Sequence, residues 1–193
     1  EWQRSASNEW EKLLKGIGKK REGKSRVIGY DTLKFILKGD VPKDKKVSYG
    51  RFVCEERPQK EETQRTRLTV GSDKLPYEGD VSTEVAGMET TKIYLNSTIS
   101  TPGARYAAAD MGNFYTNSRL PEPEYMRVHI SEIPTEVIEE YDVMKYVDAD
   151  GYVYIEINGA LYGLKQAGKI ANNDLIKHLK PHGYYPSKRT PGL

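Results

Sequence analysis

A predicted β-hairpin between residues 47 and 70 is the sequence feature that most constrains the fold. Residues 47–57 and 63–70 are rich in β-branched and aromatic side chains, as strands are, and residues 58–62 supply a polar turn. Side chains two apart share a face of a strand. One face of the second strand therefore carries Arg65, Arg67 and Thr69. The opposite face carries Thr66, Leu68 and Val70. The sequence predicts a packed hairpin with one cationic face.

The rest of the chain mixes helix and strand patterns. Helical spacing predicts an amphipathic helix over 8–14, a helix over 83–100, a turn and short helix over 112–117, an acidic helix over 134–141 and a last helix over 164–179 that Pro181 ends. Strand patterns cover 125–130 and 151–157, with a loop at 121–124 and a turn at Asn158-Gly159. Regular β-α-β alternation is absent, so we predict an α+β fold of antiparallel strands with packed helices.

Composition excludes several classes of protein. No apolar run approaches the roughly 20 residues that cross a bilayer, so we expect no membrane-spanning helix. The N-terminal residues lack a secretion signal pattern. A single cysteine, Cys54, excludes an internal disulfide, and three scattered histidines do not suggest zinc. With a net charge of +2, nucleic-acid binding must depend on local clusters, such as the basic residues at 19–21 and 24–26. By itself such a charge run favours a solvated surface over contact with a ligand.

Asp110 is the strongest single candidate for chemistry. It follows Arg105-Tyr106-Ala107-Ala108-Ala109, a stretch of small residues that we expect to be buried, and it precedes a turn. A carboxylate in that position can hold a divalent cation. It can also cap the helix that follows. The position by itself favours the cap over the metal-binding role.

Residues 161–168, Leu-Tyr-Gly-Leu-Lys-Gln-Ala-Gly, form the second candidate site. Gly163 and Gly168 flank Lys165 where a strand turns into a helix. Free backbone N–H groups and a lysine at a helix start suit a phosphate or a nucleotide, although the spacing is not that of a Walker loop. An ordinary entry turn into a helix remains the alternative.

Two nearby acids, Asp148 and Asp150, are not candidates. Ala149 separates them, and the run Asp148-Ala149-Asp150-Gly151 has the composition of a turn. No glutamate closes a twelve-residue calcium loop there. We therefore expect a structural turn at this place.

Two motifs in order resemble the reverse transcriptase of copia-type LTR retrotransposons. Asp110-Met111-Gly112-Asn113-Phe114-Tyr115 is similar to the first polymerase motif of that family, and residues 161–168 are similar to its second fingers/palm motif. Residues 65–71 are similar to its fingers strand, and residues 123–127 and 151–157 to its connecting strands. The resemblance covers residues 45–193. Residues 1–44, a polar helix and a basic loop, carry no motif of the family.

The resemblance implies an RNA-directed DNA polymerase that transfers a deoxynucleotide from a dNTP to a primer 3′ hydroxyl. It implies that Asp110 is catalytic and holds Mg²⁺ or Mn²⁺, two ions being present in the complete enzyme. Arg65 and Arg67 would bind the triphosphate, the leading one being left open. Tyr115 would exclude a 2′ hydroxyl. The remaining nucleotide-binding residues would be Gly163, Lys165 and Gln166, which shape the pocket.

The family also has an aromatic-x-Asp-Asp hairpin after its second motif, and none follows Gly168 here. We therefore expect a truncated fragment, fingers and partial palm, that is inactive or nearly so by itself. Expected partners are an RNA or DNA template with primer, dNTPs and the rest of a polymerase/RNase H polyprotein, in a cytoplasmic virus-like particle. The alternatives are a non-catalytic nucleic-acid-binding remnant and an interaction module in which Asp110 is a cap and the arginines are surface charges.

Overall fold

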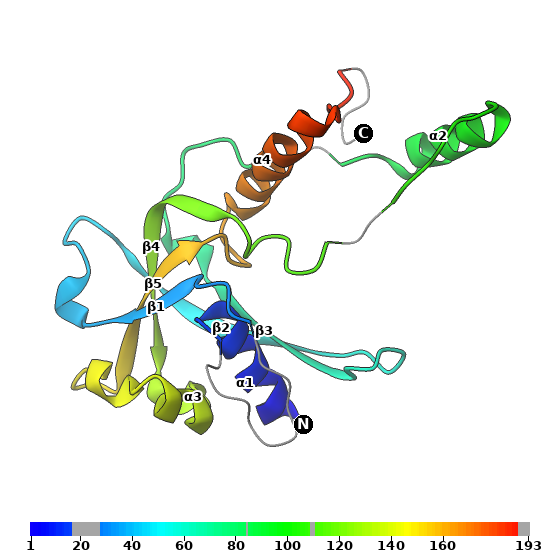
Figure 1. Cartoon of the computed structure of the whole chain (residues 1–193). Helices are drawn as coiled ribbons and strands as arrows, with labels where there is room; N and C mark the ends of the chain where they lie inside the picture. The colour runs from blue at the N-terminus through cyan, green and yellow to red at the C-terminus, as the bar shows by residue number, and fades with distance from the viewer. Residues whose placement is uncertain (17–27, 84, 109–110, 189–193) are drawn as a thin grey trace.

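The structure is a computed structural model that describes residues 1–16, 28–83, 85–108 and 111–188. Within these ranges four α-helices and a mixed, strongly curled sheet of five strands form an α+β fold, as predicted (Figure 1). The elements in chain order are α1 (Trp2–Leu13), β1 (Leu33–Ile36), β2 (Val47–Glu56), β3 (Gln64–Val70), α2 (Met88–Ser100), β4 (Arg119–His129), α3 (Thr135–Glu140), β5 (Tyr152–Gly159) and α4 (Ala167–Leu179). Among the described residues no helix has the length and apolar character that crossing a membrane requires.

The sheet has the order β1-β5-β4-β2-β3. The prediction of antiparallel strands is wrong for one pair, because β2 and β4 are parallel, while the other neighbours are antiparallel. Pairing direction depends on how distant segments meet, which strand patterns do not specify. The predicted hairpin is confirmed as β2 and β3, in which Val53 lies opposite Arg67. One face of β3 is buried, at Thr66, Leu68 and Val70. The other is half-exposed, at Arg65, Arg67 and Thr69. The predicted division into a packed face and a cationic face is therefore confirmed.

One hydrophobic core joins the N-terminal elements to the rest of the sheet. Trp10 of α1 is fully buried, stacks on Phe35 of β1 at 5.9 Å between ring centroids and meets Phe52 of β2 edge-on at 6.4 Å. The strands add Leu68, Met126, Val128, Val153, Ile155 and Ile157 to the same core. Elements from both sides of residue 45 therefore depend on one another for burial.

Helix α1 lies along β3, which is an edge strand of the sheet. The backbone N–H of Thr66 donates to Ser5 Oγ at 2.7 Å, and that of Leu68 donates to Glu9 Oε1 at 3.3 Å. An uncovered strand edge offers unpaired backbone groups to other chains. Side chains of α1 occupy these positions here, so β3 is closed to further strand pairing over this stretch.

Four other predicted elements are confirmed, with shifted ends. Helix α1 starts at Trp2, six residues before the predicted start at Asn8, and α4 starts at Ala167 instead of Leu164. Helix α3 and strand β5 lie within a few residues of their predicted positions. Helix ends are the part of a pattern that a sequence specifies least well. The basic residues at 19–21 and 24–26 lie outside the described residues.

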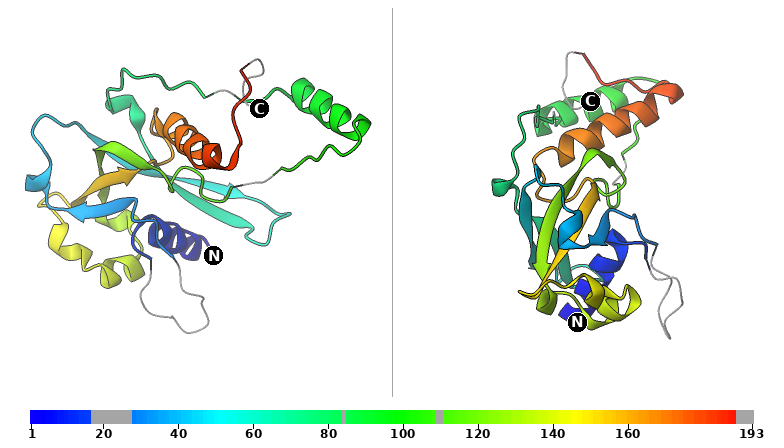
Figure 2. Two further views of the ribbon diagram at one scale, coloured as in Figure 1. Left: turned by 45° about the horizontal axis from the view of Figure 1, so that its top comes forward. Right: turned by 90° about the vertical axis from the view of Figure 1, so that its left-hand side faces the viewer.

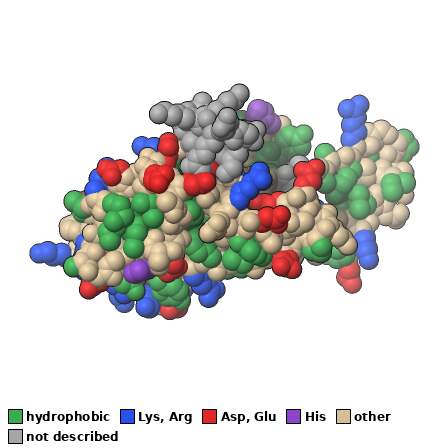
Figure 3. Space-filling model, turned by 90° about the horizontal axis from the view of Figure 1, so that it is seen from below, with side chains coloured by type: hydrophobic (Ala, Val, Ile, Leu, Met, Phe, Trp, Pro, Cys, Tyr) green, Lys and Arg blue, Asp and Glu red, His purple; other side chains and the backbone are tan. Residues whose placement is uncertain are grey.

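Helix α2 is shorter than predicted and stands away from the sheet in all three ribbon views (Figures 1 and 2). It starts at Met88, five residues after the predicted start, and none of its residues is buried. The apolar residues at helical spacing, Val85, Met88, Leu95 and Ile99, are exposed. Figure 3 shows hydrophobic side chains on the surface of the lobe at the right, where α2 lies. Helical spacing therefore predicted the helix correctly without implying that its apolar stripe is packed.

Two expectations around Asp110 are wrong. Residues 105–108 are exposed, not buried. Alanine carries little apolar surface, so a run of alanines has only a weak drive toward burial. Residues 112–117 form turns without the predicted short helix. Asn113 has a left-handed backbone with φ of 55°, and one such residue interrupts a right-handed helix.

The predicted loop at 121–124 is part of strand β4. The register between β4 and β5 shifts between Arg119 and Glu124. A break in the regular ladder accommodates Pro121 and Pro123, which have no N–H to donate. The loop expectation failed because prolines mark the irregular part of a strand as well as they mark a loop.

The predicted turn at Asn158-Gly159 is the end of strand β5. The backbone N–H of Asn158 donates to the Thr32 carbonyl at 2.7 Å. This bond to a distant segment extends the strand through a dipeptide that by itself favours a turn. Tertiary pairing therefore overrides the local preference here.

Candidate functional site

The candidate site lies where the segment that leaves β5 meets the end of β3. Residues 160–166 connect β5 to α4, and their backbone is attached to β3 because Val70 N–H donates to the Tyr162 carbonyl at 2.9 Å. Leu161 is fully buried beside this bond. This bond holds β3, which carries Arg65 and Arg67, beside the motif at residues 161–168.

Gly163 is required at this junction. Its φ is 97°, a conformation that residues with a side chain rarely adopt. A Cβ at this position would also lie 2.2 Å from the Val70 carbonyl oxygen. The sequence predicted Gly163 as a pocket residue, and the structure places it in a tight backbone contact with β3.

Arg67 is the arginine that contacts the second motif. The central carbon of its guanidinium lies 4.9 Å from the centre of the Tyr162 ring, a cation–π distance. Its buried Nε has no hydrogen-bond acceptor among the described residues. Arg65 lies two residues nearer the hairpin tip, opposite Glu55. The structure thus distinguishes two arginines that the sequence treated alike.

Tyr115 reaches the same ring from the turn at 112–118. Its ring centre is 5.1 Å from that of Tyr162, and the two planes are nearly perpendicular at 86°. Asn113 and Phe114 belong to the turn itself: Asn113 Nδ2 donates to the Tyr30 hydroxyl at 2.9 Å, and the Phe114 ring contacts that of Tyr115. Tyr162 therefore lies between Arg67 and Tyr115.

Lys165 and Gln166 are directed to different neighbours. Lys165 Nζ donates to the Leu75 carbonyl at 3.2 Å. Gln166 is buried, with 6% of its surface exposed, and its Nε2 donates to Glu124 Oε1 at 3.2 Å. Burial raises the pKa of Glu124, while the Gln166 hydrogen bond and the charge of Lys45 act in the opposite direction. Gln166 is thus fixed at the start of α4 by a partly buried carboxylate.

Asp110 lies outside the described residues, so its predicted metal-binding and capping roles stay predictions. Among the residues that the structure describes, no three His, Cys, Asp or Glu side chains form a group that could hold a metal ion. A groove of about 420 Å³ begins at Met111, directly after this aspartate, and runs between the 112–118 turn and α4. Phe114, Leu175 and His178 are among the side chains that line it.

The turn predicted at Asp148 is confirmed. Asp148 Oδ1 accepts the backbone N–H groups of Tyr152 at 2.9 Å and Asp150 at 3.0 Å. The Tyr152 bond is the main cause that lowers the pKa of Asp148, and the ion pair with Lys38 at 3.1 Å adds to it. Gly151 follows with a φ of 81°. The Asp148 carboxylate therefore has structural partners, as expected of a turn.

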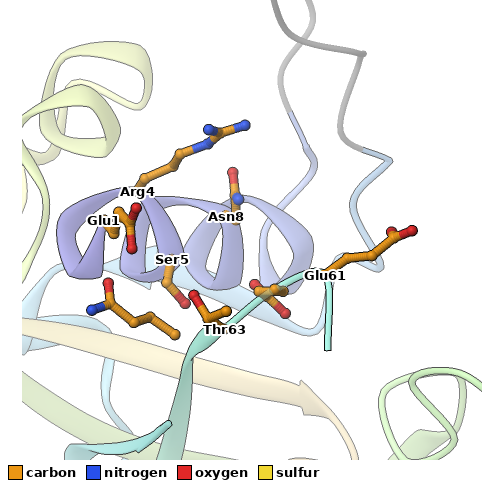
Figure 4. Close-up of a pocket in the computed structure, with 8 residues that line it drawn as sticks. Glu1, Arg4, Ser5, Asn8, Glu61 and Thr63 are labelled. Carbon is orange, nitrogen blue, oxygen red and sulfur yellow. The ribbon is translucent and has the colours of Figure 1, made fainter. Parts of the chain in front are cut away.

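A second cavity lies between the start of α1 and the start of β3 (Figure 4). It has a volume of about 380 Å³ and is lined by Arg4, Ser5 and Asn8 from the helix and by Glu61 and Thr63 from the hairpin, among others. None of the sequence-predicted site residues contributes to it. The cavity combines one arginine with several carboxylates, and this mixture of charges does not favour one class of ligand.

Sequence reasoning did not select two residues that the structure places in the candidate site. Tyr162 lies inside the motif at 161–168, but its contacts come from residues far away in the chain. Glu124 lies in a stretch that was expected to be a loop. The link of Glu124 to the site is its hydrogen bond to Gln166, 42 residues further along the chain, which no local pattern signals.

No protein-family model, no curated protein and no solved structure matches the chain, so its resemblance to a reverse transcriptase stays a prediction from the motifs.

Proposed function

We propose that this chain is a segment of an RNA-directed DNA polymerase of the copia retrotransposon type, comprising fingers and part of a palm. The observation that supports the proposal is the contact of Arg67 and Tyr115 with Tyr162. These residues come from three segments that are far apart in the sequence. The motif resemblance assigns all three segments to one nucleotide site.

In this proposal Arg67 binds the triphosphate of an incoming dNTP, because a guanidinium presents several N–H donors to phosphate oxygens. Arg65, further along the same face of β3, adds positive charge. Tyr115 lies at the sugar and excludes a 2′ hydroxyl. Gln166, Gly163 and Lys165 shape the wall of the pocket.

Asp110 holds the divalent cations in this proposal. Mg²⁺ neutralises charge on the triphosphate and activates the primer 3′ hydroxyl in nucleotidyl transfer. One carboxylate does not hold two ions, so further acidic ligands have to come from another part of the polyprotein. The protein's partners are then a template with primer, dNTPs and the rest of that polyprotein.

Binding of Mg²⁺–dTTP to the chain tests the nucleotide site directly. Arg67→Ala is expected to weaken binding by about tenfold to a hundredfold, since a charge-assisted contact contributes about 1.5–3 kcal/mol. Arg127→Ala is the matched control, because Arg127 lies over Tyr152, 4.4 Å from the ring centre, on another part of the sheet. Equal losses in both variants would contradict the assignment of Arg67.

Primer extension tests the activity. The chain is expressed together with the reading frame that follows it, and Asp110→Asn is the control. We expect Mg²⁺-dependent extension that Asp110→Asn abolishes. Salt-dependent binding to template–primer without dTTP binding or extension would favour the alternative of a non-catalytic nucleic-acid-binding remnant.

A further inference from the structure

Tyr162 contacts both side chains on which the proposed nucleotide site depends. Its ring lies 4.9 Å from the Arg67 guanidinium carbon and 5.1 Å from the Tyr115 ring centre. Arg67 comes from β3 and Tyr115 from the turn before β4, so the chain provides no local connection between them. Both side chains contact this one ring.

The ring itself has a defined position because its backbone is fixed on both sides. The Tyr162 carbonyl accepts the Val70 N–H at 2.9 Å, Leu161 before it is fully buried, and Gly163 after it is in close contact with the Val70 backbone. Such a backbone restricts where the Tyr162 side chain can lie. Tyr162 therefore has the rigidity that a positioning residue needs.

A ring is a suitable support for an arginine that binds an anion. A guanidinium held over a ring keeps its N–H donors for another partner, whereas a carboxylate partner occupies them. Arg57 illustrates the second case, since its Nη2 donates to Glu62 Oε2 at 2.9 Å. Arg67 lies over Tyr162, so it is fixed in place and still able to donate hydrogen bonds to phosphate oxygens.

We propose that Tyr162 is a positioning residue that holds Arg67 and Tyr115 at a set separation. One nucleoside triphosphate can then contact Arg67 through its phosphates and Tyr115 through its sugar at the same time. The inference rests on the proposed function. Tyr162 does not itself contact the reacting atoms. Its ring, and not its hydroxyl, carries the role, because both contacts are made by the ring.

The test compares Tyr162→Phe, which keeps the ring, with Tyr162→Leu, which removes it. Affinities for Mg²⁺–dTTP and for Mg²⁺–5-methyl-UTP, which differs from dTTP only by the 2′ hydroxyl, are measured by calorimetry on folded protein. Tyr162→Leu is expected to bind Mg²⁺–dTTP about tenfold more weakly, a loss of about 1.4 kcal/mol in binding free energy, and to lose its preference for Mg²⁺–dTTP over Mg²⁺–5-methyl-UTP. Tyr162→Phe should behave as the unsubstituted chain. Tyr152→Leu, which removes the ring beneath Arg127, is the matched control and should leave both affinities unchanged.

A double variant separates positioning from a general loss of structure. If Tyr162 acts through Arg67, Arg67→Ala with Tyr162→Leu binds Mg²⁺–dTTP no more weakly than Arg67→Ala does, because coupled residues are not additive. Additive losses overturn the positioning role. If Tyr162→Leu does not fold, the NMR resonances of the Arg67 side chain decide: an upfield ring-current shift in the unsubstituted chain and in Tyr162→Phe supports the contact, and its absence overturns it.

The positioning role and the proposed function fail in different ways. If Arg67→Ala binds Mg²⁺–dTTP as tightly as the unsubstituted chain, the nucleotide site is wrong and the role of Tyr162 is wrong with it. If Arg67→Ala weakens binding and a folded Tyr162→Leu does not, only the positioning role is overturned.

Discussion

At the scale of single residues, burial makes the ionised form of the Glu9 carboxyl unfavourable in the folded chain. Its carboxylate is largely buried between α1 and β3 and accepts the Leu68 N–H. Burial raises the pKa of Glu9, and the Leu68 hydrogen bond and the charges of Lys12, Arg65 and Arg67 only partly offset that effect. The ionised form is therefore less favourable in the folded chain than in the unfolded one.

The sign of the pH dependence follows from this raised pKa. Above the ordinary pKa of a glutamate the folded state binds more protons than the unfolded state, so this group lowers the free energy of unfolding as pH rises. Glu9→Gln removes this pH-dependent loss of stability and keeps a side-chain oxygen that can accept the Leu68 N–H. We expect the stability of Glu9→Gln relative to the unsubstituted chain to increase from about pH 4 to about pH 7.

Urea unfolding at several pH values measures this difference. Glu61→Gln, at an exposed residue of the hairpin turn, is the control and should stay within about 0.5 kcal/mol of the unsubstituted chain at each pH. A Glu9→Gln curve that runs parallel to the unsubstituted one would show that the burial of Glu9 has no energetic consequence.

Gly163 gives a second prediction at this scale. Gly163→Ala is expected to lower the free energy of unfolding by on the order of 3 kcal/mol, because it combines a strained φ with a clash against the Val70 carbonyl. Gly183→Ala is the control: Gly183 has a similar φ of 85°, but nothing lies within 4 Å of an added Cβ. Chemical denaturation should show the larger loss for Gly163→Ala, and equal losses would contradict the clash.

The sequence anticipated the site residues unevenly at this scale. Motif resemblance selected Arg67, Tyr115 and Gln166. In the structure Arg67 and Tyr115 contact the ring of Tyr162, and Gln166 donates to Glu124 at the start of α4. It did not select Tyr162 or Glu124, since their importance comes from partners that lie far away along the chain. Residue type and spacing do not encode such partners.

At the scale of elements, the contact of α1 with β3 protects a sheet edge. Ser5 Oγ accepts the Thr66 N–H, and both residues are buried. Ser5→Ala leaves this N–H without an acceptor. Such a loss costs about 1–3 kcal/mol, so we expect that decrease in the free energy of unfolding.

Ser7→Ala is the matched control for this prediction. Ser7 is on the same helix and just as buried, at 3% against 6% exposed for Ser5, but it lines a cavity beside the start of α3. Thermal or urea unfolding of the two variants compares them directly. Equal losses would mean that burial of the serine, not the capped strand edge, is what stabilises the chain.

Element prediction succeeded where one pattern dominated and failed where local and tertiary preferences disagreed. The strict alternation of β3 predicted both its strand and its buried face. Residues 121–124 and 158–159 have loop and turn composition, yet pairing within the sheet makes them strand. Helix α2 has a correct helical pattern, yet none of its residues is buried.

At the scale of the whole molecule, residues 1–44 complete the core of the rest. Helix α1 buries Trp10 and Leu13 in the core, as does Leu14 directly after the helix, and β1 pairs with β5. Removing residues 1–44 exposes this apolar surface and the edge of β3. Burial of one large apolar side chain contributes about 1.5–3 kcal/mol, so the loss of several exceeds the stability of an ordinary domain.

We therefore expect a chain of residues 45–193 to lack a cooperative unfolding transition, measured by circular dichroism against urea. The full chain should unfold cooperatively under the same conditions. A cooperative transition in the shortened chain would contradict the single shared core and would favour an independent unit that starts at residue 45.

Charge also acts at the scale of the molecule. The net charge is +2, and Figure 3 shows basic and acidic side chains interspersed over the visible face. Such a surface does not attract nucleic acid by its overall field. Binding in the proposed function depends on a few placed cations, Arg67 first among them.

The sequence by itself determined the α+β class, the hairpin with its cationic face and most of the helices, because period-two and helical spacing are local properties of a chain. Only the tertiary structure decided that Tyr162 lies between Arg67 and Tyr115 and that Gln166 meets Glu124, 42 residues away. Contacts between distant segments depend on sheet register and on how the helices pack, and these arise from the whole chain folding together.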